Sequence, residues 1–216
     1  MPLRRKLKNL LRELDKHSPW PVLYSFIMTK KEKALFDKEI KRSKTYLEFG
    51  TGGSTIRALK KSGAKIYSVD SSADWITSVR KYWVIRRAEK KRLSLFHVDI
   101  GPVKEWGTPV GNDSKELFPH YSSGVFRLVE KEYIDIVLID GRFRVACALK
   151  TILECSVNNP PRILIHDFWN REEYHILLKY LEEADRADTL GAFIIKKSID
   201  LDSVIRDYEL YKYIPA

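Results

Sequence analysis

Three glycines follow a short apolar run near residue 45. The run TYLEF over 45–49 continues into GTGGST over 50–55. Gly50 and Gly52 let a backbone turn tightly and approach a ligand, while Ser54 or Thr55 can cap the helix that should begin at about Thr55. An ordinary tight turn needs one glycine, so this run predicts a ligand-binding turn between a strand and a helix.

Glu48 limits what this turn can hold. A dinucleotide-binding turn that starts at Gly50 would have glycine at position 55, where this chain has Thr55, and it would bind a pyrophosphate. A carboxylate two residues before the first glycine repels phosphate but can act on an ammonium group, directly or through water. The sequence therefore favours a nucleoside that carries an amino acid.

Further acids follow the next two apolar runs. Asp70 and Ser71 come directly after KIYSV over 65–69, and Asp99 and Ile100 end the run LSLFHVDI. In nucleoside-binding α/β folds a carboxylate after the second strand accepts hydrogen bonds from both ribose hydroxyls. Asp99 is placed to accept from an exocyclic adenine amine, with Ser71 and Ile100 beside the base.

These residues require a particular set of elements to bring them together. The predicted strands are 45–49, 65–69, 93–98, 135–139, 162–166 and 191–196, with helical stretches between them. The strand runs lack polar and apolar alternation, as expected for parallel strands covered on both faces. The sequence predicts a doubly wound α/β domain. The long connection over 99–134 predicts a lid or binding loop.

The motifs E-F-G-T-G-G-S-T, V-D-S-S, H-V-D-I, I-D-G and I-H-D together resemble those of class I S-adenosylmethionine-dependent methyltransferases, over about residues 46–196. The resemblance implies S-adenosylmethionine as cofactor and a Rossmann-like sheet that is mostly parallel with an antiparallel last strand. Its seventh strand would lie near residues 182–189, where the strand pattern is weak. It implies Glu48, Gly50 and Gly52 at the methionine moiety, Asp70 at the ribose and Asp99 at adenine. The full set of residues expected at the cofactor is Glu48, Gly50, Thr51, Gly52, Ser54, Thr55, Asp70, Ser71, Asp99 and Ile100.

Two strand ends remain for the methyl acceptor. Asp140 follows the fourth predicted strand, and His166 and Asp167 follow the fifth. Methyl transfer from a sulfonium is an in-line displacement, and a hydroxyl acceptor must also lose a proton, so these three residues are the candidate catalytic bases. Acids at these two positions also resemble the divalent-metal site of catechol-type and macrolide-sugar O-methyltransferases. Because Phe168 stands where a further ligand would be expected, metal dependence stays open.

Arginines and aromatic residues accompany these acids. Arg142 and Arg144 open the predicted helix after Asp140 and could hold hydroxyls, carboxylate or phosphate with a planar fork. Trp106 and Trp169, with Phe118 and Tyr121, could form a stacking wall for an acceptor. We therefore expect Arg142, Arg144, Trp106 and Trp169 at the substrate.

The runs DGRFRVA, IHDF and DIGPVKEWG also resemble small methyltransferases related to enzymes that O-methylate sugars and glycans. The chain has no Asn/Asp-Pro-Pro-Tyr run after the fourth strand, which argues against methylation of base amino groups. The leading hypothesis is an S-adenosylmethionine-dependent O-methyltransferase that acts on a sugar or glycan hydroxyl. The alternatives are an RNA methyltransferase, motivated by a predicted basic helix over 80–92, and a non-catalytic protein that binds S-adenosylmethionine.

The positive charge is concentrated near the N-terminus. Residues 1–44 carry 13 basic and 5 acidic side chains, whereas the whole 216-residue chain has a net charge of +10. We expect a basic helical extension over 1–44 and a methyltransferase domain over 45–216. The first helix, with leucines at helical spacing, is expected to pack on the domain as a strap. The sequence predicts neither a secretion signal nor a transmembrane segment, and Cys147 and Cys155 are expected to be reduced, as in a cytoplasmic protein.

Overall fold

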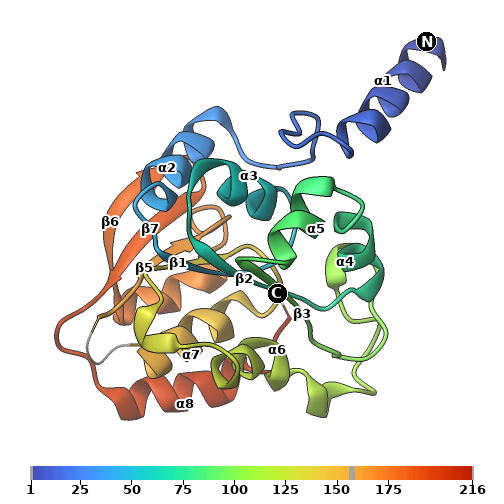
Figure 1. Ribbon diagram of the computed structural model, residues 1–216. Coiled ribbons are helices and arrows are strands. Elements are labelled where there is room, and N and C mark those ends of the chain that lie inside the picture. Colours follow the sequence, from blue (N-terminus) through green and yellow to red (C-terminus); the bar gives the residue numbers. More distant parts are fainter. Residues whose placement is uncertain (1, 156–158, 216) are drawn as a thin grey trace.

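The computed structural model describes residues 2–155 and 159–215, with the side chains of residues 2–8 outside that description. One sheet is flanked by helices on both faces (Figure 1). Its strands are β1 (Thr45–Phe49), β2 (Lys65–Asp70), β3 (Leu93–His97), β4 (Ile136–Ile139), β5 (Arg162–Ile165), β6 (Leu181–Ala187) and β7 (Leu190–Ile195). The helices are α1 (Pro2–Asp15), α2 (Lys30–Ile40), α3 (Gly53–Lys61), α4 (Ala73–Val79), α5 (Trp83–Glu89), α6 (Pro119–Ser123), α7 (Arg144–Cys155) and α8 (Leu201–Tyr211).

The order of strands across the sheet is β3-β2-β1-β4-β5-β7-β6. Strands β1 to β5 are mutually parallel, and β7 runs antiparallel to both β5 and β6. This arrangement confirms the predicted Rossmann-like sheet with an antiparallel strand near its end. The weak pattern near residues 182–189 is a strand, β6.

Successive residues of the central strands pack into two different cores, which explains why these strands lack polar alternation. Tyr46 joins a core with α2, α3 and α5, whereas Leu47 joins the core that contains α7 and α8. All five residues of β1 are buried. Because side chains alternate between the faces of a strand, both faces of β1 must be covered.

The connection between β3 and β4, predicted to be a lid or binding loop, folds into two different halves. Its second half contains α6 and short 3-10 turns, and Phe118, Tyr121 and Phe126 are buried in the core beside α7. Its first half forms a small turn in which Val103 pairs with Pro109. Only this first half is free to act as a binding loop, because the second half contributes to the core.

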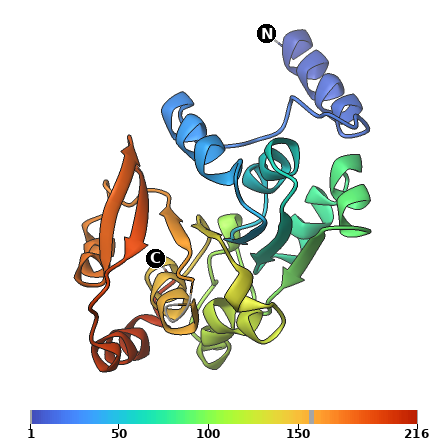
Figure 2. The same ribbon diagram turned by 60° about the vertical axis from the view of Figure 1, so that its left-hand side comes forward.

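Two predicted helices also differ from the structure. The described leucines of α1, Leu10, Leu11 and Leu14, are 57%, 46% and 60% exposed, and α1 stands away from the other elements in both views (Figure 1, Figure 2). The prediction of a packed strap is therefore wrong for these residues. The predicted basic helix over 80–92 is shorter, since α5 covers only Trp83–Glu89.

Helix α2 is well anchored. Thr29 and Glu32 form a capping box, and Leu35, Phe36 and Ile40 bury its apolar face in the core. No helix within the described residues combines the length and the hydrophobicity that a bilayer span requires. Cys147 and Cys155 are both buried and unpaired, as the sequence predicted.

The sheet order reverses between β1 and β4, because the chain builds outward from β1 to β3 and then returns to the other side of β1. In such sheets ligands bind beyond the carboxyl ends of the strands at this reversal. The carboxyl ends of β1 and β4 lie very close together at this reversal. A Cβ added at Gly50, whose φ is +107°, would lie 2.8 Å from the Gly141 nitrogen and 2.9 Å from the Asp140 carbonyl carbon.

Replacement of Gly50 by alanine should therefore lower the free energy of unfolding by about 2 kcal/mol or more, since it adds backbone strain and a clash with main-chain atoms. Gly63→Ala is the matched control, because nothing lies within 4 Å of its added Cβ. Urea denaturation of both variants measures the effect. Equal stability of the two variants would contradict the close approach.

Candidate active site

The glycine turn after β1 is held from behind by Glu48. The Gly52 N–H donates to Oγ1 of Thr55 at 2.9 Å, and this hydroxyl in turn donates to Oε1 of Glu48. The Tyr46 hydroxyl donates to Oε2 of Glu48 at 2.8 Å. Glu48 is completely buried, so it supports the turn through Thr55, and its predicted action on an ammonium group remains a prediction.

Burial also changes the charge of Glu48. It raises the pKa of this carboxyl to about 7, against the lowering effect of hydrogen bonds from Thr55, Ser54, Ser68 and Tyr46. The glycine turn therefore rests on a carboxyl group that gains or loses its proton near neutral pH.

Asp70 lies at the end of β2, beside the glycine turn. Its Oδ2 accepts from the Thr51 N–H at 3.0 Å, and its Oδ1 accepts from the Ser72 N–H at 2.9 Å. Burial raises the pKa of Asp70, although these backbone hydrogen bonds lower it. Since a carboxylate has about four acceptor sites, Asp70 keeps acceptor capacity for a ligand after making both bonds.

The loop after β3 lies close to the end of β2. Oγ of Ser71 donates to the Gly107 carbonyl at 3.2 Å, and a Cβ at Gly107 would lie 3.9 Å from Oδ1 of Asp70. Trp106, at φ +64°, is 71% exposed. Trp106 immediately precedes Gly107 in this loop, and most of the residue is exposed.

The remaining predicted cofactor residues lie around the same strand ends. Asp99 is exposed and accepts from the Gly101 N–H at 2.8 Å, while Ile100 is buried. Ser54 is buried in the first turn of α3. Sequence reasoning missed Trp75, whose Nε1 donates to the Thr51 carbonyl at 2.7 Å. Its ring would lie 3.6 Å from a Cβ at Gly52, so it forms one side of the glycine turn.

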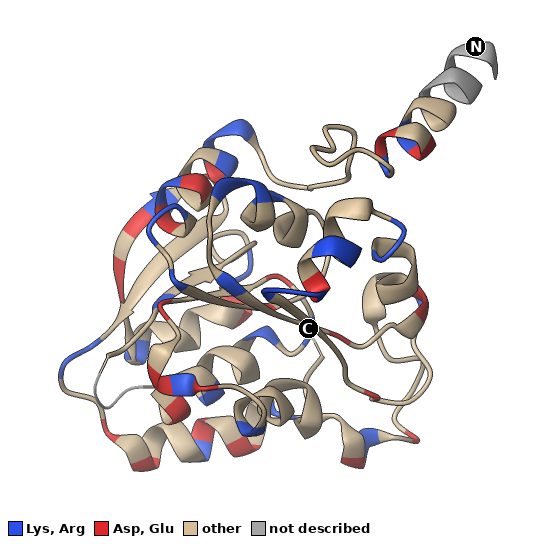
Figure 3. Cartoon of the chain, viewed as in Figure 1, with Lys and Arg blue, Asp and Glu red and all other residues tan. Residues whose placement is uncertain are grey.

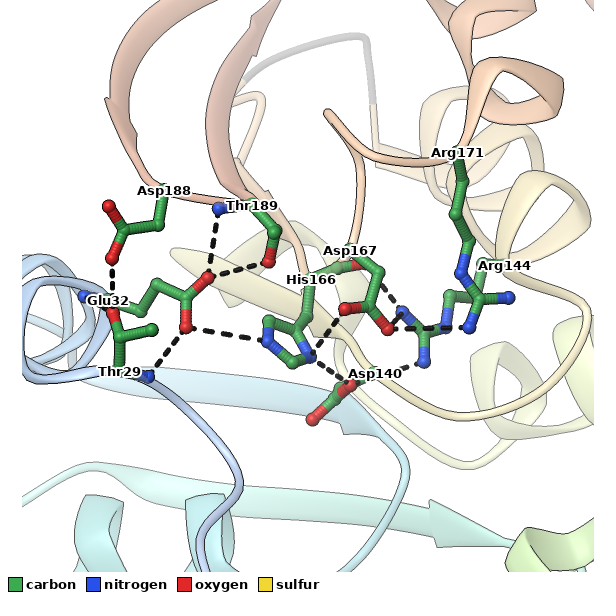
Figure 4. A network of polar contacts seen from close by, with 9 residues as sticks. All are labelled: Thr29, Glu32, Asp140, Arg144, His166, Asp167, Arg171, Asp188 and Thr189. Atoms are coloured by element: carbon green, nitrogen blue, oxygen red, sulfur yellow. Dashed lines mark hydrogen bonds and ion pairs between the residues drawn. The ribbon is translucent and has the colours of Figure 1, made fainter.

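The predicted catalytic residues do come together, around Arg144 (Figure 4). Nδ1 of His166 lies 2.8 Å from Oδ1 of Asp140. The buried guanidinium of Arg144 lies 3.3 Å from Oδ1 of Asp140 and 3.1 Å from Oδ2 of Asp167. Arg144 also donates to the Gly141 carbonyl at 3.0 Å and to the His166 carbonyl at 2.5 Å. Arg144 is thus occupied by the protein, and it holds the two acids in place.

His166 lies between two carboxylates (Figure 4). Its Nε2 is 3.7 Å from Oε2 of Glu32, a residue from the start of α2. Burial lowers the pKa of His166, but the hydrogen bond and charge of Asp140, followed by the charge of Asp167, raise it on balance. The charges of Asp140 and Asp167 therefore stabilise the protonated form of His166.

Sequence reasoning also missed Glu32, which is 2% exposed. Its oxygens accept from the Thr29 N–H at 2.7 Å, and from the N–H and hydroxyl of Thr189 at 3.0 and 2.6 Å. The available signal was the spacing of Thr29 and Glu32, which is that of a capping box. Glu32 joins α2, the β6–β7 turn and His166.

The acids were also candidates for a divalent cation. One ligand atom from each of Asp140, His166 and Asp167 lies within 4.8 Å of the others. Their carboxylates already share the positive charge of Arg144, however, and Nδ1 of His166 is directed at Asp140. As they lie, these residues do not fit a divalent cation, and no step proposed below uses one.

The predicted substrate residues lie in different places. Within the described residues, the buried Nε of Arg142 has no hydrogen-bond partner, so this guanidinium remains available to a ligand. Trp169 packs against Phe168 and Phe193 beside β7. Trp106 lies near the end of β2, four strand positions from β7. Trp106 and Trp169 therefore do not form one stacking wall.

Among known proteins, this chain is similar to solved structures that share its fold. No protein-family model and no curated protein matches the sequence. A methyltransferase-like protein from Silicibacter pomeroyi is 28% identical, with a TM-score of 0.77, covering 89% of this chain and 98% of that chain. The fold is that of the class I methyltransferases.

Two more distant structures share this fold. An RNA methyltransferase from Salinibacter ruber, in complex with S-adenosyl-L-homocysteine, is 14% identical, with a TM-score of 0.50 over 81% of this chain and 97% of that chain. A mutant of MtNAS, in complex with S-adenosylmethionine, is 15% identical, with a TM-score of 0.52 over 88% of this chain and 72% of that chain.

The raised pKa of Glu48 predicts a pH-dependent stability. Between its usual value of 4.5 and about 7, the folded protein keeps a proton that the unfolded chain has released, so this group makes the protein less stable as pH rises through that range. Glu48→Gln removes the titration. Relative to wild type, this variant should gain about 2 to 3 kcal/mol of unfolding free energy between about pH 5 and pH 8.

Urea denaturation at the two pH values measures this difference. The control is Glu116→Gln, which removes an exposed carboxylate and should shift by no more than about 0.5 kcal/mol. A stability difference between Glu48→Gln and wild type that does not change with pH would show that Glu48 is ionised throughout.

Proposed function

We propose that this protein is an S-adenosylmethionine-dependent O-methyltransferase that acts on a hydroxyl of a sugar or glycan. The observation that carries the proposal is the contact between the β1 and β4 ends, which places the glycine turn directly beside Asp140. A donor held by the glycine turn and an acceptor held near Asp140 would meet where the strand order reverses.

The proposed donor site uses the glycine turn and the ends of β2 and β3. Asp70 has carboxylate acceptor sites left for the ribose hydroxyls, and we assign Ser71 and Ile100 to the adenine. The bound S-adenosyl-L-homocysteine of the Salinibacter ruber protein and the bound S-adenosylmethionine of MtNAS support this donor, since both proteins share the fold.

The proposed acceptor site lies over Asp140. Its Oδ1 is occupied by His166 and Arg144, but within the described residues no hydrogen bond reaches its Oδ2. Asp140 is therefore the residue we assign to accept the hydroxyl proton as the oxygen attacks the methyl group. His166 and Arg144 would fix the orientation of this carboxylate, and the unpartnered guanidinium of Arg142 would hold the acceptor.

Two substitutions should separate donor binding from chemistry. Asp70→Ala removes charge-assisted hydrogen bonds and should weaken S-adenosylhomocysteine binding about 10- to 150-fold, as measured by isothermal titration calorimetry. Asp140→Asn keeps the shape of the side chain, so it should bind the same ligand as wild type does while methyl transfer to a sugar panel falls about 100-fold or more.

Asp74→Asn, an exposed acid on α4, is the control for Asp70 and should behave as wild type. Unchanged ligand affinity in Asp70→Ala would refute the donor site. Unchanged turnover in Asp140→Asn would refute the assigned base.

RNA is the second candidate acceptor, because basic residues lie on α5 (Figure 3) and residues 1–44 of the sequence carry 13 basic and 5 acidic side chains. Salt separates the two acceptors. The affinity for RNA should fall steeply between 50 and 200 mM salt, since phosphate contacts release counterions, whereas the affinity for a neutral sugar should barely change. Measuring the KM for the acceptor at both salt concentrations decides between them.

A further inference from the structure

A cleft lies where the N-terminal segment crosses α3 and α5. The cleft has a volume of about 490 Å³ and is lined by Trp20, Lys60, Trp83, Arg87, Lys91 and Arg92, with small apolar contributions between them. None of the lining residues is acidic. The cleft therefore combines two indole rings with four cationic side chains.

The cleft is separate from the candidate active site. Lys60 lies seven residues beyond Gly53 along α3, about 10 Å from the glycine turn along the helix axis. Arg92 immediately precedes β3, whereas the donor site lies after the other end of this strand. The cleft thus opens near the amino ends of the strands.

Specific contacts hold the N-terminal segment in place over these helices. Nζ of Lys60 donates to the Pro21 carbonyl at 2.5 Å, and the Trp83 N–H donates to the Lys16 carbonyl at 2.7 Å. Nζ of Lys60 also lies 5.1 Å from the centre of the Trp20 ring. These contacts fix Trp20 as one wall of the cleft, although 60% of the residue remains exposed.

The four cations divide into two kinds. Lys60 and Arg92 are committed to the fold, since Arg92 donates to the Ala64 and Leu59 carbonyls at 2.8 Å. Arg87 and Lys91 are exposed, and neither has an ion pair or hydrogen bond from its side chain within the described residues. Arg87 lies over the Trp83 ring at 5.2 Å. Two cations, one helical turn apart, are therefore available to a ligand.

We propose that this cleft binds single-stranded nucleic acid, with phosphates on Arg87 and Lys91 and a base stacked on Trp20. A single strand presents a negative charge at every residue and an unpaired base beside it. The exposed indole of Trp20 next to cationic side chains matches both features. The proposal goes beyond methyl transfer and does not depend on it.

The test measures how tightly the full-length protein binds a single-stranded RNA of about twelve nucleotides. The RNA carries a fluorescent label, and its fluorescence anisotropy reports binding. The double variant R87Q/K91Q should weaken binding and reduce the slope of log affinity against log salt by about 1.4, which corresponds to two lost phosphate contacts. Trp20→Ala should weaken binding about fivefold or more and leave the slope unchanged, because stacking releases no counterions. Trp20→Phe should keep most of the affinity.

The matched control is R127Q/K197Q, which removes the same charges from exposed positions outside the cleft and should keep the wild-type salt slope. Equal weakening in the control and the cleft variant would overturn the proposal. So would RNA binding that is insensitive to Trp20→Ala, or a sulfated polysaccharide that binds as tightly as RNA. Binding of S-adenosylhomocysteine by each variant checks folding and keeps failure of this proposal distinct from failure of the proposed function.

Discussion

The close contact between the ends of β1 and β4 is the constraint on which the candidate site depends. The reversal of strand order brings these two ends together, and only glycine fits at position 50, because the main chain of Asp140 and Gly141 lies within 3 Å of the space for a side chain. The turn at Gly50 then faces Asp70 on one side and Asp140 on the other. The fold thus places Asp70, the proposed ribose-binding carboxylate, and Asp140, the proposed base, on either side of one turn.

The charge of Arg144 is the second requirement of this arrangement. Asp140 and Asp167 stand on neighbouring strand ends with His166 between them, and two partly buried carboxylates would repel each other without a cation. Arg144 provides that cation from the first residue of α7, and three carbonyl or carboxylate groups fix its orientation in addition to Asp140. The positive charge that these two acids need is therefore supplied by Arg144 itself.

The sequence could predict those features that depend on local pattern. Apolar runs located six strands, and the acids that follow them are correctly expected at one edge of the sheet, since parallel strands end on the same side. Features that depend on distant contacts were missed or misjudged. Arg144 looked like a substrate residue because its partners, Asp140 and Asp167, are separated in sequence from each other by a whole helix and strand. Strand β6 carries exposed acids and pairs only with β7 at the sheet edge, so its sequence shows little of the apolar pattern of a buried strand.

The N-terminal segment shows most clearly why charge alone was a poor guide. Its excess of basic residues suggested a separate appendage, yet α2 buries three apolar side chains in the core and brings Glu32 to within 3.7 Å of His166. The preceding residues cross α3 and α5 and are held there by Lys60 and Trp83. One stretch of chain therefore contacts both the candidate catalytic cluster, at the carboxyl ends of the strands, and the cationic cleft near their amino ends. The net charge of such a segment depends only on its composition. The role of the segment depends on the few buried contacts that attach it to the fold.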